Sequence, residues 1–340
     1  MKKKILIGFI NKDFSGPIPI ITQSFIDGLS NKFNFIPFEM NRSNQNLQRK
    51  FNLINIYYLI KHFFSWVKYL IKYRPDIVHF PVTSFWNLEK SLFFLHTAKL
   101  LGAKVVIGHL HGGSFDKFWD NLSPIRKKNG VYLLERLDHF IVLGTFWENF
   151  FKNKVKFKKL SIVNNPIAKD FEIYFNSFNR DYNQDSLLFV GSIGKRKGCY
   201  DIIQCFEKHS IKNTLTIIGP EESQGDISNI KKLVNKFSNK IEIQKPIYGN
   251  QKNTFFKDAG IFLFPSYNEN FPLVIIEAAC AGMPIITTPV GALPEFFTHM
   301  ENIYFVTPGN IEEIMNGIKF FNDNKNERKR IGEGARQVFE

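Results

Sequence analysis

Two glutamates, Glu269 and Glu277, lie eight positions apart in the stretch of the sequence that carries the most chemical information. Glu269 stands in a loop after an apolar run that ends at Pro265, and Glu277 stands in a helix expected to begin near Pro272, because proline is tolerated in the first helical turn. The first N–H groups of such a helix have no helical acceptor, and the helix dipole favours an anion beside them. The two carboxylates could therefore bind hydroxyl groups at the two ends of a ligand whose phosphates lie between them.

A second group of residues could bind phosphate. The apolar run 187–190 leads into a loop rich in glycine and in positive charge. Its glycines and cations are Gly191, Gly194, Lys195, Arg196, Lys197 and Gly198. Glycine lets the backbone approach a phosphate closely, and Lys and Arg neutralise its charge. Neither the P-loop pattern nor the pattern Gly-x-Gly-x-x-Gly of dinucleotide-binding folds occurs here. Taken alone, the loop is equally consistent with a solvated basic turn.

A histidine, His111, follows the apolar run 105–110 and precedes Gly112 and Gly113. At the carboxyl end of a buried strand, such a side chain would face the region where open α/β sheets bind ligands. His109 lies in the same run, and we expect side-chain alternation to turn it elsewhere, in a structural role.

Short apolar runs separated by helical stretches must position these residues. The runs cover residues 5–10, 77–80, 105–110, 139–143, 187–190, 215–218 and 261–264. Such alternation predicts parallel sheets with helices on both faces. The stretch 160–185 interrupts the pattern, so we place a domain boundary near Ile167. The chain is predicted to be an α/β protein with two doubly wound, Rossmann-like domains that face each other across a cleft.

The positive charge is unevenly distributed. The net charge is +14, but residues 1–163 carry 25 basic and 10 acidic side chains, whereas residues 164–340 carry 20 and 21. A basic half indicates an anionic partner, which could be nucleic acid, phospholipid headgroups or a phosphorylated substrate. A solvated basic surface would give the same imbalance.

The segment 51–73 is rich in aromatic residues and contains Lys61, Lys68 and Lys72 but no acidic residue. Such a helix can lie in a membrane interface, with its lysines toward anionic headgroups. An ordinary helix packed on the first sheet would also fit. Phe63, Phe64 and Trp66 occupy adjoining positions, however, so one packed stripe cannot bury all three. A second basic cluster, 152–159, follows two phenylalanines.

The remaining composition indicates a reducing compartment. Three cysteines are too few and too scattered for a disulfide framework or a zinc site. We expect no secretory signal, because the apolar run after Lys4 is short and lacks a small-residue cleavage site. The sequence has no apolar stretch of about 20 residues that could span a bilayer.

The two-glutamate segment, together with residues 278–284 and 291–295, resembles the donor-site signature of glycosyltransferase family 4, the glycosyl transferases group 1. These are retaining enzymes with the GT-B fold. Further segments resemble the family in the right order along nearly the whole chain: 74–79, 111–112, 163–166 and 190–198. The resemblance implies an acceptor-side domain over 1–166, a nucleotide-sugar domain over 167–325, and the start of a crossover helix over 326–340.

The resemblance also implies a role for each matching residue. Glu277 would bind the ribose hydroxyls, Glu269 the hydroxyls of the donor sugar, and Lys197 the diphosphate. His111 would lie near the anomeric carbon, and Gly16, in the loop 15–17, would close over the phosphates. The implied catalytic residues are His111, Glu269 and Lys197. The implied donor-binding residues are Gly16, Gly191, Arg196, Lys197, Glu269, Asn270, Phe271, Leu273, Val274 and Glu277.

The chain departs from the family pattern at three places. Ser192 stands where the family often has arginine, and Arg196 could supply the missing charge. The usual double glycine of the N-terminal loop is reduced to Gly16. Pro272 replaces a glycine after Phe271, which removes one backbone donor. The chain also stops at Glu340, where the family often continues into the crossover helix.

We therefore expect a retaining, metal-independent glycosyltransferase of bacterial surface-polysaccharide type that forms an α-linkage. The donor is expected to be a UDP-sugar rather than a GDP-sugar, without any further cofactor, and the acceptor is expected to be a saccharide in free or lipid-linked form, with the lipid-linked form favoured. The chain would work in the cytoplasm, peripherally on the inner face of an anionic membrane, without a nucleic-acid partner. Three alternatives remain at this stage: a glycoside hydrolase, a GT-B-like epimerase, and a basic nucleic-acid-binding protein.

Overall fold

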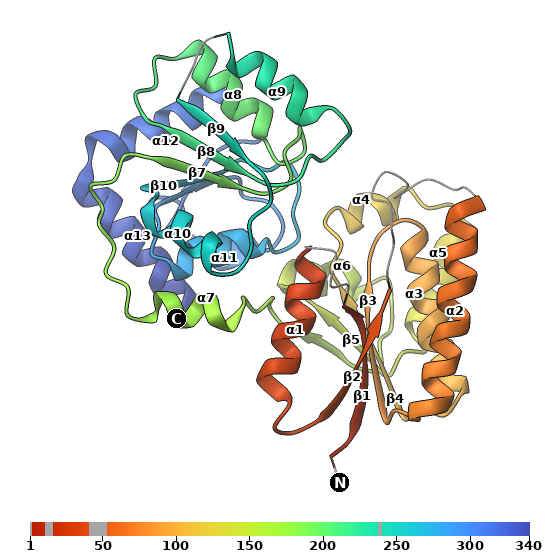
Figure 1. Cartoon of the computed structure of the whole chain (residues 1–340). Helices are drawn as coiled ribbons and strands as arrows, with labels where there is room; N and C mark the ends of the chain where they lie inside the picture. Colours follow the sequence, from red (N-terminus) through yellow and green to blue (C-terminus); the bar gives the residue numbers. More distant parts are fainter. Residues whose placement is uncertain (1, 11–15, 41–52, 237–239) are drawn as a thin grey trace. The chain divides into compact units, whose positions relative to one another are not determined.

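A computed structural model describes residues 2–10, 16–40, 53–236 and 240–340 (Figure 1). The chain forms two compact units, Met1–Ala168 and Lys169–Glu340, which we call the N-terminal and C-terminal units. From the sequence we expect the division two residues earlier, after residue 166. Each unit contains a six-stranded parallel sheet with helices on both faces, so the predicted α/β class with two doubly wound domains is confirmed.

The N-terminal sheet has the strand order β2-β1-β3-β4-β5-β6. Its strands are β1 (Lys4–Ile10), β2 (Asn34–Glu39), β3 (Ile77–Val82), β4 (Val105–Leu110), β5 (His139–Val142) and β6 (Leu160–Ile162). Its helices are α1 (Pro17–Leu29), α2 (Leu53–Tyr73), α3 (Trp86–Leu100), α4 (Phe115–Asp120), α5 (Pro124–Leu134) and α6 (Thr145–Lys152). Helix α1 covers one face of the sheet, whereas α2, α3 and α5 lie side by side on the other (Figure 1).

The C-terminal sheet has the strand order β12-β11-β10-β7-β8-β9. Its strands are β7 (Leu187–Val190), β8 (Leu215–Ile218), β9 (Ile241–Gln244), β10 (Ile261–Phe264), β11 (Ile285–Thr287) and β12 (Tyr304–Phe305). Its α-helices are α7 (Lys169–Asn176), α8 (Cys199–Lys208), α9 (Asp226–Val234), α10 (Asn250–Asp258), α11 (Leu273–Cys280), α12 (Ile311–Asp323) and α13 (Lys325–Phe339). Within this unit, α13 packs against α11 and α12.

The seven predicted strands are confirmed as β1, β3, β4, β5, β7, β8 and β10. Five further strands were not predicted: β2, β6, β9, β11 and β12. Apart from β11, they lack a continuous apolar run. Strand β2 contains Pro37, β9 includes Glu242, and β12 has only two residues. An edge strand forms by hydrogen bonding to its neighbour and does not need a continuous apolar run, so the sequence pattern that would predict it is weak.

Helix α2 is anchored to the sheet by Trp66, whose side chain is fully buried. Its indole Nε1 donates a hydrogen bond to the carbonyl oxygen of Phe94 at 2.9 Å. Rings from three other elements surround the indole: Phe38, Phe80 and Phe94. Phe64, two positions earlier, is 68% exposed. As expected, one packed stripe does not bury all the aromatic residues of this helix.

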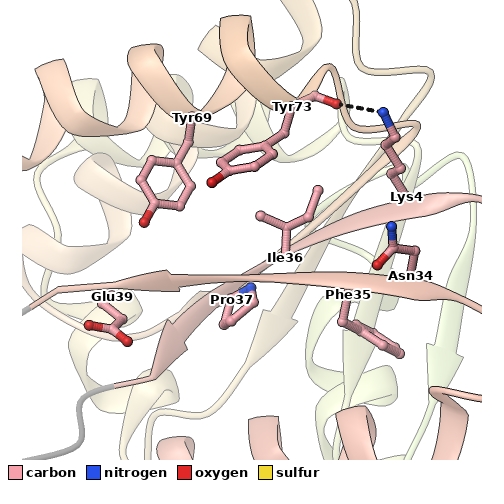
Figure 2. A pocket seen from close by; sticks show the side chains of 8 residues that line it. All are labelled: Lys4, Asn34, Phe35, Ile36, Pro37, Glu39, Tyr69 and Tyr73. Carbon is pink, nitrogen blue, oxygen red and sulfur yellow. Dashed lines mark hydrogen bonds between the residues drawn. The ribbon is translucent and has the colours of Figure 1, made fainter.

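A surface hollow of about 460 Å³ lies between the edge strand β2 and the C-terminal part of α2 (Figure 2). Tyr69 and Tyr73 approach it from the helix, and Lys4 donates a hydrogen bond to the Tyr73 carbonyl oxygen at 3.3 Å. The residues predicted to carry the chemistry are not among those that line this hollow. Its location at the sheet edge is therefore separate from the predicted donor site.

Arg180 fastens the segment after α7 to the rest of the C-terminal unit. Its guanidinium is buried and donates to the carbonyl oxygens of Phe256, Ala259 and Ala281 at 2.6, 2.8 and 2.7 Å. Burial lowers the pKa of Arg180 to about 10, which leaves the group charged at neutral pH. One side chain thus satisfies carbonyl groups at the ends of α10 and α11.

Replacing Arg180 with methionine should destabilise the C-terminal unit. The variant leaves three buried carbonyl oxygens without their donor, so we expect a loss of about 3 kcal/mol in the free energy of unfolding. Hydrogen exchange of α10 and α11 amides under increasing urea measures this loss. The matched control is Lys329→Met on α13, where the side chain is exposed; a change within about 0.5 kcal/mol is expected there. Equal stability of the two variants would contradict the assignment.

Candidate donor site

The residues predicted to bind phosphate and sugar lie at the carboxyl edge of the C-terminal sheet. From β7 the sheet extends toward β9 in one direction and through β10 toward β12 in the other. The loops after β7 and β10 therefore meet where the strand order reverses, which is where open α/β sheets bind ligands. The β7 loop, 191–198, carries Arg196 and Lys197, and the β10 loop, 265–272, carries Glu269.

Glycines allow the β7 loop to pack closely against its neighbours. Gly198 has a φ of +73°, and a Cβ atom there would lie 2.1 Å from the Pro265 carbonyl oxygen. A Cβ atom at Gly194 would lie 2.5 Å from the Cβ of Glu222, in the loop after β8. Gly191 opens the loop directly after β7. The β7 loop thus packs closely against the backbone of the β10 loop on one side and against Glu222 on the other.

Four charged side chains form what we call the phosphate-loop cluster: Arg196, Lys197, Glu222 and Glu269. Arg196 donates from Nε to Glu222 Oε1 at 2.5 Å, and its backbone N–H donates to Glu222 Oε2 at 3.1 Å. Lys197 forms an ion pair with Glu269, and Arg196 Nη1 lies 3.9 Å from Glu269 Oε1. The structure therefore brings together three residues that the sequence predicted and one, Glu222, that it did not.

Neighbouring loops hold the Glu269 side chain in place. The buried Ser266 hydroxyl donates to Glu269 Oε1 at 2.8 Å, and Thr288 donates from its hydroxyl to the Ser266 carbonyl oxygen. The N–H of Ala292 donates to the carbonyl oxygen of Asn270 at 2.9 Å. The loops that follow β10 and β11 are consequently tied to each other beside the glutamate.

The phosphate-loop cluster carries two positive and two negative groups, so it is neutral when all four are ionised. The side chains of Lys197 and Glu269 are only 14% and 11% exposed. Burial lowers the pKa of Lys197, and the Glu269 carboxylate opposes that effect. An entering diphosphate would have to take the cations over from the carboxylates. Released Glu269 would then need new donors, such as sugar hydroxyl groups.

Helix α11 begins at Leu273, with Pro272 as its N-cap, close to the predicted start. Phe271 and Leu273 are each 6% exposed, Asn270 is buried and Val274 is half-buried. Their side chains therefore pack into the unit, and what they can offer an anion is mainly backbone N–H. Their role in donor binding stays a prediction.

Glu277 lies within α11, and its side chain is only 3% exposed. Its two oxygens lie 2.5 and 2.6 Å from the Nζ atom of Lys252, on α10. Lys252 was not predicted from the sequence. The carboxylate expected to bind ribose is thus already paired with a buried cation.

The other two predicted residues belong to the N-terminal unit. Gly16 is the N-cap of α1 and has an extended backbone, and Ser15, in the same predicted loop, lies outside the described residues. His111 follows β4 directly, and its N–H donates to the Val82 carbonyl oxygen at 2.9 Å. Gly16 and His111 both lie at the carboxyl edge of the N-terminal sheet.

His111 is the outermost of three neighbouring histidines. The ring centres of His109 and His111 lie 4.1 Å apart, and His109 Nδ1 lies 3.2 Å from His79 Nε2. The prediction that alternation turns His109 away from His111 is wrong. Residues two positions apart in a strand point to the same face, so the two rings contact each other.

Burial keeps these three imidazoles neutral. It lowers the pKa of His79 to about 4 and that of His111 to about 3, and it also lowers the pKa of His109. Neighbouring histidines lower these pKa values further, His139 for His79, His111 and His79 for His109, and His79 for His111, because adjacent imidazolium groups repel each other. A neutral imidazole has one donor and one acceptor nitrogen, so His111 could donate to or accept from a substrate hydroxyl at neutral pH.

Three residues of the site were missed by sequence reasoning: Glu222, Ser266 and Lys252. Glu222 had a usable signal, since it follows the apolar run 215–218 and parallel strands bring their carboxyl ends to one edge. The sequence contains no signal for Lys252, because this residue lies on a short polar helix without a recognisable spacing of residues.

Within the ranges that the structure describes, no group of three or more His, Cys, Asp or Glu residues could hold a metal ion.

Comparison with known proteins identifies relatives of the C-terminal unit. Residues 170–338 match the sequence model of the family described as glycosyl transferases group 1. The capsular polysaccharide biosynthesis glycosyltransferase CapM of Staphylococcus aureus is 26% identical over 193 residues, 55% of this chain and 48% of CapM. The chain spans about half or less of the length of the first curated relatives that it matches.

Solved structures share the fold of the whole chain. Sucrose-phosphate synthase from Thermosynechococcus elongatus has a TM-score of 0.78 at 16% identity, covering 100% of this chain and 94% of that chain. HepE of Anabaena, solved in complex with UDP-glucose, has a TM-score of 0.70 at 14% identity, covering 100% of this chain and 94% of HepE. At such low identity these matches support the GT-B fold and leave activity open.

The buried histidines should make the N-terminal unit sensitive to acid. Their folded pKa values lie below the ordinary 6.5, so their stabilising effect is present above pH 6.5 and is lost as the pH falls toward 4. His79→Gln, which binds no proton in this range, should reduce the stability lost between pH 7.5 and pH 5 by about 1–2 kcal/mol.

Urea unfolding followed by tryptophan fluorescence measures this effect. All four tryptophans, Trp66, Trp86, Trp119 and Trp147, lie in the N-terminal unit, so their fluorescence reports on it alone. His299→Gln, in the C-terminal unit, is the control and should leave the pH dependence unchanged. The same loss of stability in His79→Gln as in the unsubstituted chain would contradict the prediction.

Proposed function

Because the chain belongs to the glycosyl transferases group 1 family, we propose that it transfers a sugar from a nucleotide diphosphate sugar to a saccharide acceptor. One observation carries the proposal: the two strands at which the order of the C-terminal sheet reverses, β7 and β10, are followed by Arg196 and Lys197 and by Glu269 and the start of α11, the helix that carries Glu277. The polysaccharide role of the relative CapM supports a place in cell-surface polysaccharide or glycolipid synthesis.

In this proposal each end of the donor meets a different group. Glu277 accepts hydrogen bonds from the ribose hydroxyls, and Glu269 accepts from hydroxyls of the sugar. Arg196, Lys197 and the first N–H groups of α11 bind the diphosphate between them. UDP-glucose is bound by the structural relative HepE, which favours a UDP-sugar over a GDP-sugar as the donor of this chain.

The chemical step breaks the bond between the anomeric carbon and the diphosphate oxygen. Negative charge develops on the leaving diphosphate, and cations and helix N–H groups already in place would stabilise it without reorganisation. The same donors would act without a metal ion. We propose retention of configuration by front-face substitution, in which the leaving phosphate accepts the acceptor's proton and an α-linkage forms. The roles expected of His111 and Gly16, which belong to the N-terminal unit, stay predictions.

For the acceptor side, we propose that the N-terminal unit binds an anionic membrane surface. Thirteen of the nineteen exposed large apolar side chains in the described part of the chain lie on α2, α3 and α5 or at their ends. We call this set the three-helix surface: Ile54, Tyr57, Leu59, Ile60, Phe64, Ile71, Phe85, Trp86, Phe93, Leu100, Leu101, Ile125 and Tyr132. A soluble domain rarely exposes so much apolar surface on adjacent elements without a partner.

The charge of the same helices selects the kind of partner. Helices α2, α3 and α5 contain eight Lys and Arg residues and one acidic residue, Glu89. Apolar side chains that insert between headgroups, combined with cations that attract anionic lipids, are the features of a protein that lies on a membrane. No described helix is both long and apolar enough to cross a bilayer. We therefore propose a peripheral protein on the cytoplasmic face, which receives its saccharide acceptor in lipid-linked form.

The donor site is tested by calorimetry against UDP, GDP and ADP. We expect UDP to bind most tightly, and Glu277→Ala to weaken that binding about tenfold or more, because a charged acceptor is lost. Glu207→Ala, an exposed glutamate on α8, should bind UDP like the unsubstituted chain. If no nucleotide binds, the proposed function fails. Turnover of a UDP-sugar to its epimer without acceptor would favour an epimerase.

The membrane surface is tested by flotation with phosphatidylcholine vesicles, with and without phosphatidylglycerol. We expect binding to the anionic vesicles only, and its loss in Phe64→Ser/Phe93→Ser, since each exposed ring contributes about 1.5–3 kcal/mol of transfer free energy when buried. The control is Tyr248→Ser, an exposed aromatic residue of the C-terminal unit. Equal failure to bind both kinds of vesicle, or equal binding by the double variant, would contradict the proposal.

A further inference from the structure

Lys252 and Glu277 form a buried ion pair that joins α10 to α11. The Lys252 Nζ atom contacts both carboxylate oxygens, at 2.5 and 2.6 Å. Side-chain exposure is 14% for Lys252 and 3% for Glu277. Both oxygens of the glutamate are thus held by one cation, which fixes the plane of the carboxylate as well as its position.

Two aromatic rings hold the lysine from its other sides. Its Nζ atom lies 5.8 Å from the ring centre of Phe171, on α7, and 5.6 Å from that of Phe256, on α10. Both phenylalanine side chains are buried, and their rings are 5.2 Å apart in an edge-to-face arrangement. A cation over two ring faces loses much of the freedom that a lysine normally has, so the ammonium group is fixed relative to α11.

Stability alone does not account for this pair. The free energy needed to remove two charges from water is about as large as the free energy gained from their attraction. Replacing such a pair with packed apolar residues is therefore often neutral or stabilising for the fold. Arg180, by contrast, has a structural role that three backbone carbonyls make plain. Within the residues that the structure describes, neither side chain of the Lys252–Glu277 pair has another hydrogen bond that would explain why a lysine is needed here.

We propose that Lys252 is a positioning residue of the nucleoside subsite, which holds the Glu277 carboxylate so that it accepts hydrogen bonds from the ribose hydroxyls of a nucleotide. This inference rests on the proposed function, since it takes the ligand to be a nucleotide. The inference adds to the proposed function a residue on α10, a helix that no sequence pattern connects with the donor.

The chemistry requires a charged carboxylate at this position. An ionised carboxylate has two oxygens and accepts on both, whereas a protonated one has turned one oxygen into a donor. The Glu277 side chain is only 3% exposed, so Lys252 supplies the donor that water cannot supply there. Each oxygen can accept more than one hydrogen bond, so the contacts with Lys252 leave acceptor capacity for two neighbouring hydroxyl groups.

The test compares two ligands that share the ribose and differ in phosphate. Binding of UDP is measured by calorimetry, and binding of uridine by its displacement of labelled UDP. We expect Lys252→Met to weaken both ligands by the same factor, about tenfold or more. Lys197→Met should weaken UDP but leave uridine nearly unchanged, because its partner is the diphosphate. Lys252→Arg, which can still pair with both oxygens, should stay within about threefold of the unsubstituted chain.

Lys257→Met is the matched control, because it removes an exposed lysine from the same helix. Circular dichroism and thermal unfolding show whether each variant is folded, and Lys252→Gln replaces Lys252→Met if the latter is not. Unchanged uridine affinity in a folded Lys252 variant, stronger binding, or weaker binding of UDP alone would each overturn the inference while leaving nucleotide binding intact. Failure of the unsubstituted chain to bind any nucleotide would instead overturn the proposed function.

Discussion

The proposed donor site depends on the neutralisation of buried carboxylates by lysines from other parts of the chain. Glu269 is paired with Lys197 across two loops, and Glu277 with Lys252 across two helices. The side chains of Glu269 and Glu277 are only 11% and 3% exposed, so each lysine supplies a charged donor where water has little access. The close packing at Gly194 and Gly198 places the β7 loop where it can supply the first of these cations. The packing that places these loops and helices at the sheet edge is thus the same packing that pairs each glutamate with its lysine.

The parts of this arrangement that could be predicted are those with a local pattern. Strands such as β7 and β10 are continuous apolar runs, and Arg196, Lys197 and Glu269 follow them directly. Since parallel strands end at one edge, their proximity follows from the alternation of strands and helices. The start of α11 at Leu273 could be predicted because proline marks it. These features need no knowledge of long-range packing.

The parts that could not be predicted depend on contacts between distant residues. Lys252 reaches Glu277 across 25 positions, and Glu222 reaches Arg196 across 26. No spacing rule links such pairs, because the relative placement of two helices or two loops is set by packing of the whole unit. The prediction for His109 is wrong for a local reason: residues two positions apart in a strand share a face, so the rings of His109 and His111 lie together.

The neutral phosphate-loop cluster also has a consequence for selectivity among anions. If Arg196 and Lys197 had no carboxylate partners, their charge would attract inorganic phosphate, which is abundant in cells. A bound phosphate ion would then compete with the proposed donor. Here each cation already has a carboxylate partner, so a small anion must displace a glutamate and can offer it nothing in return. A nucleotide sugar brings hydroxyl donors for the displaced carboxylate in the same molecule. In the proposed function, this charge balance would therefore disfavour simple anions and favour a ligand that joins phosphate to sugar.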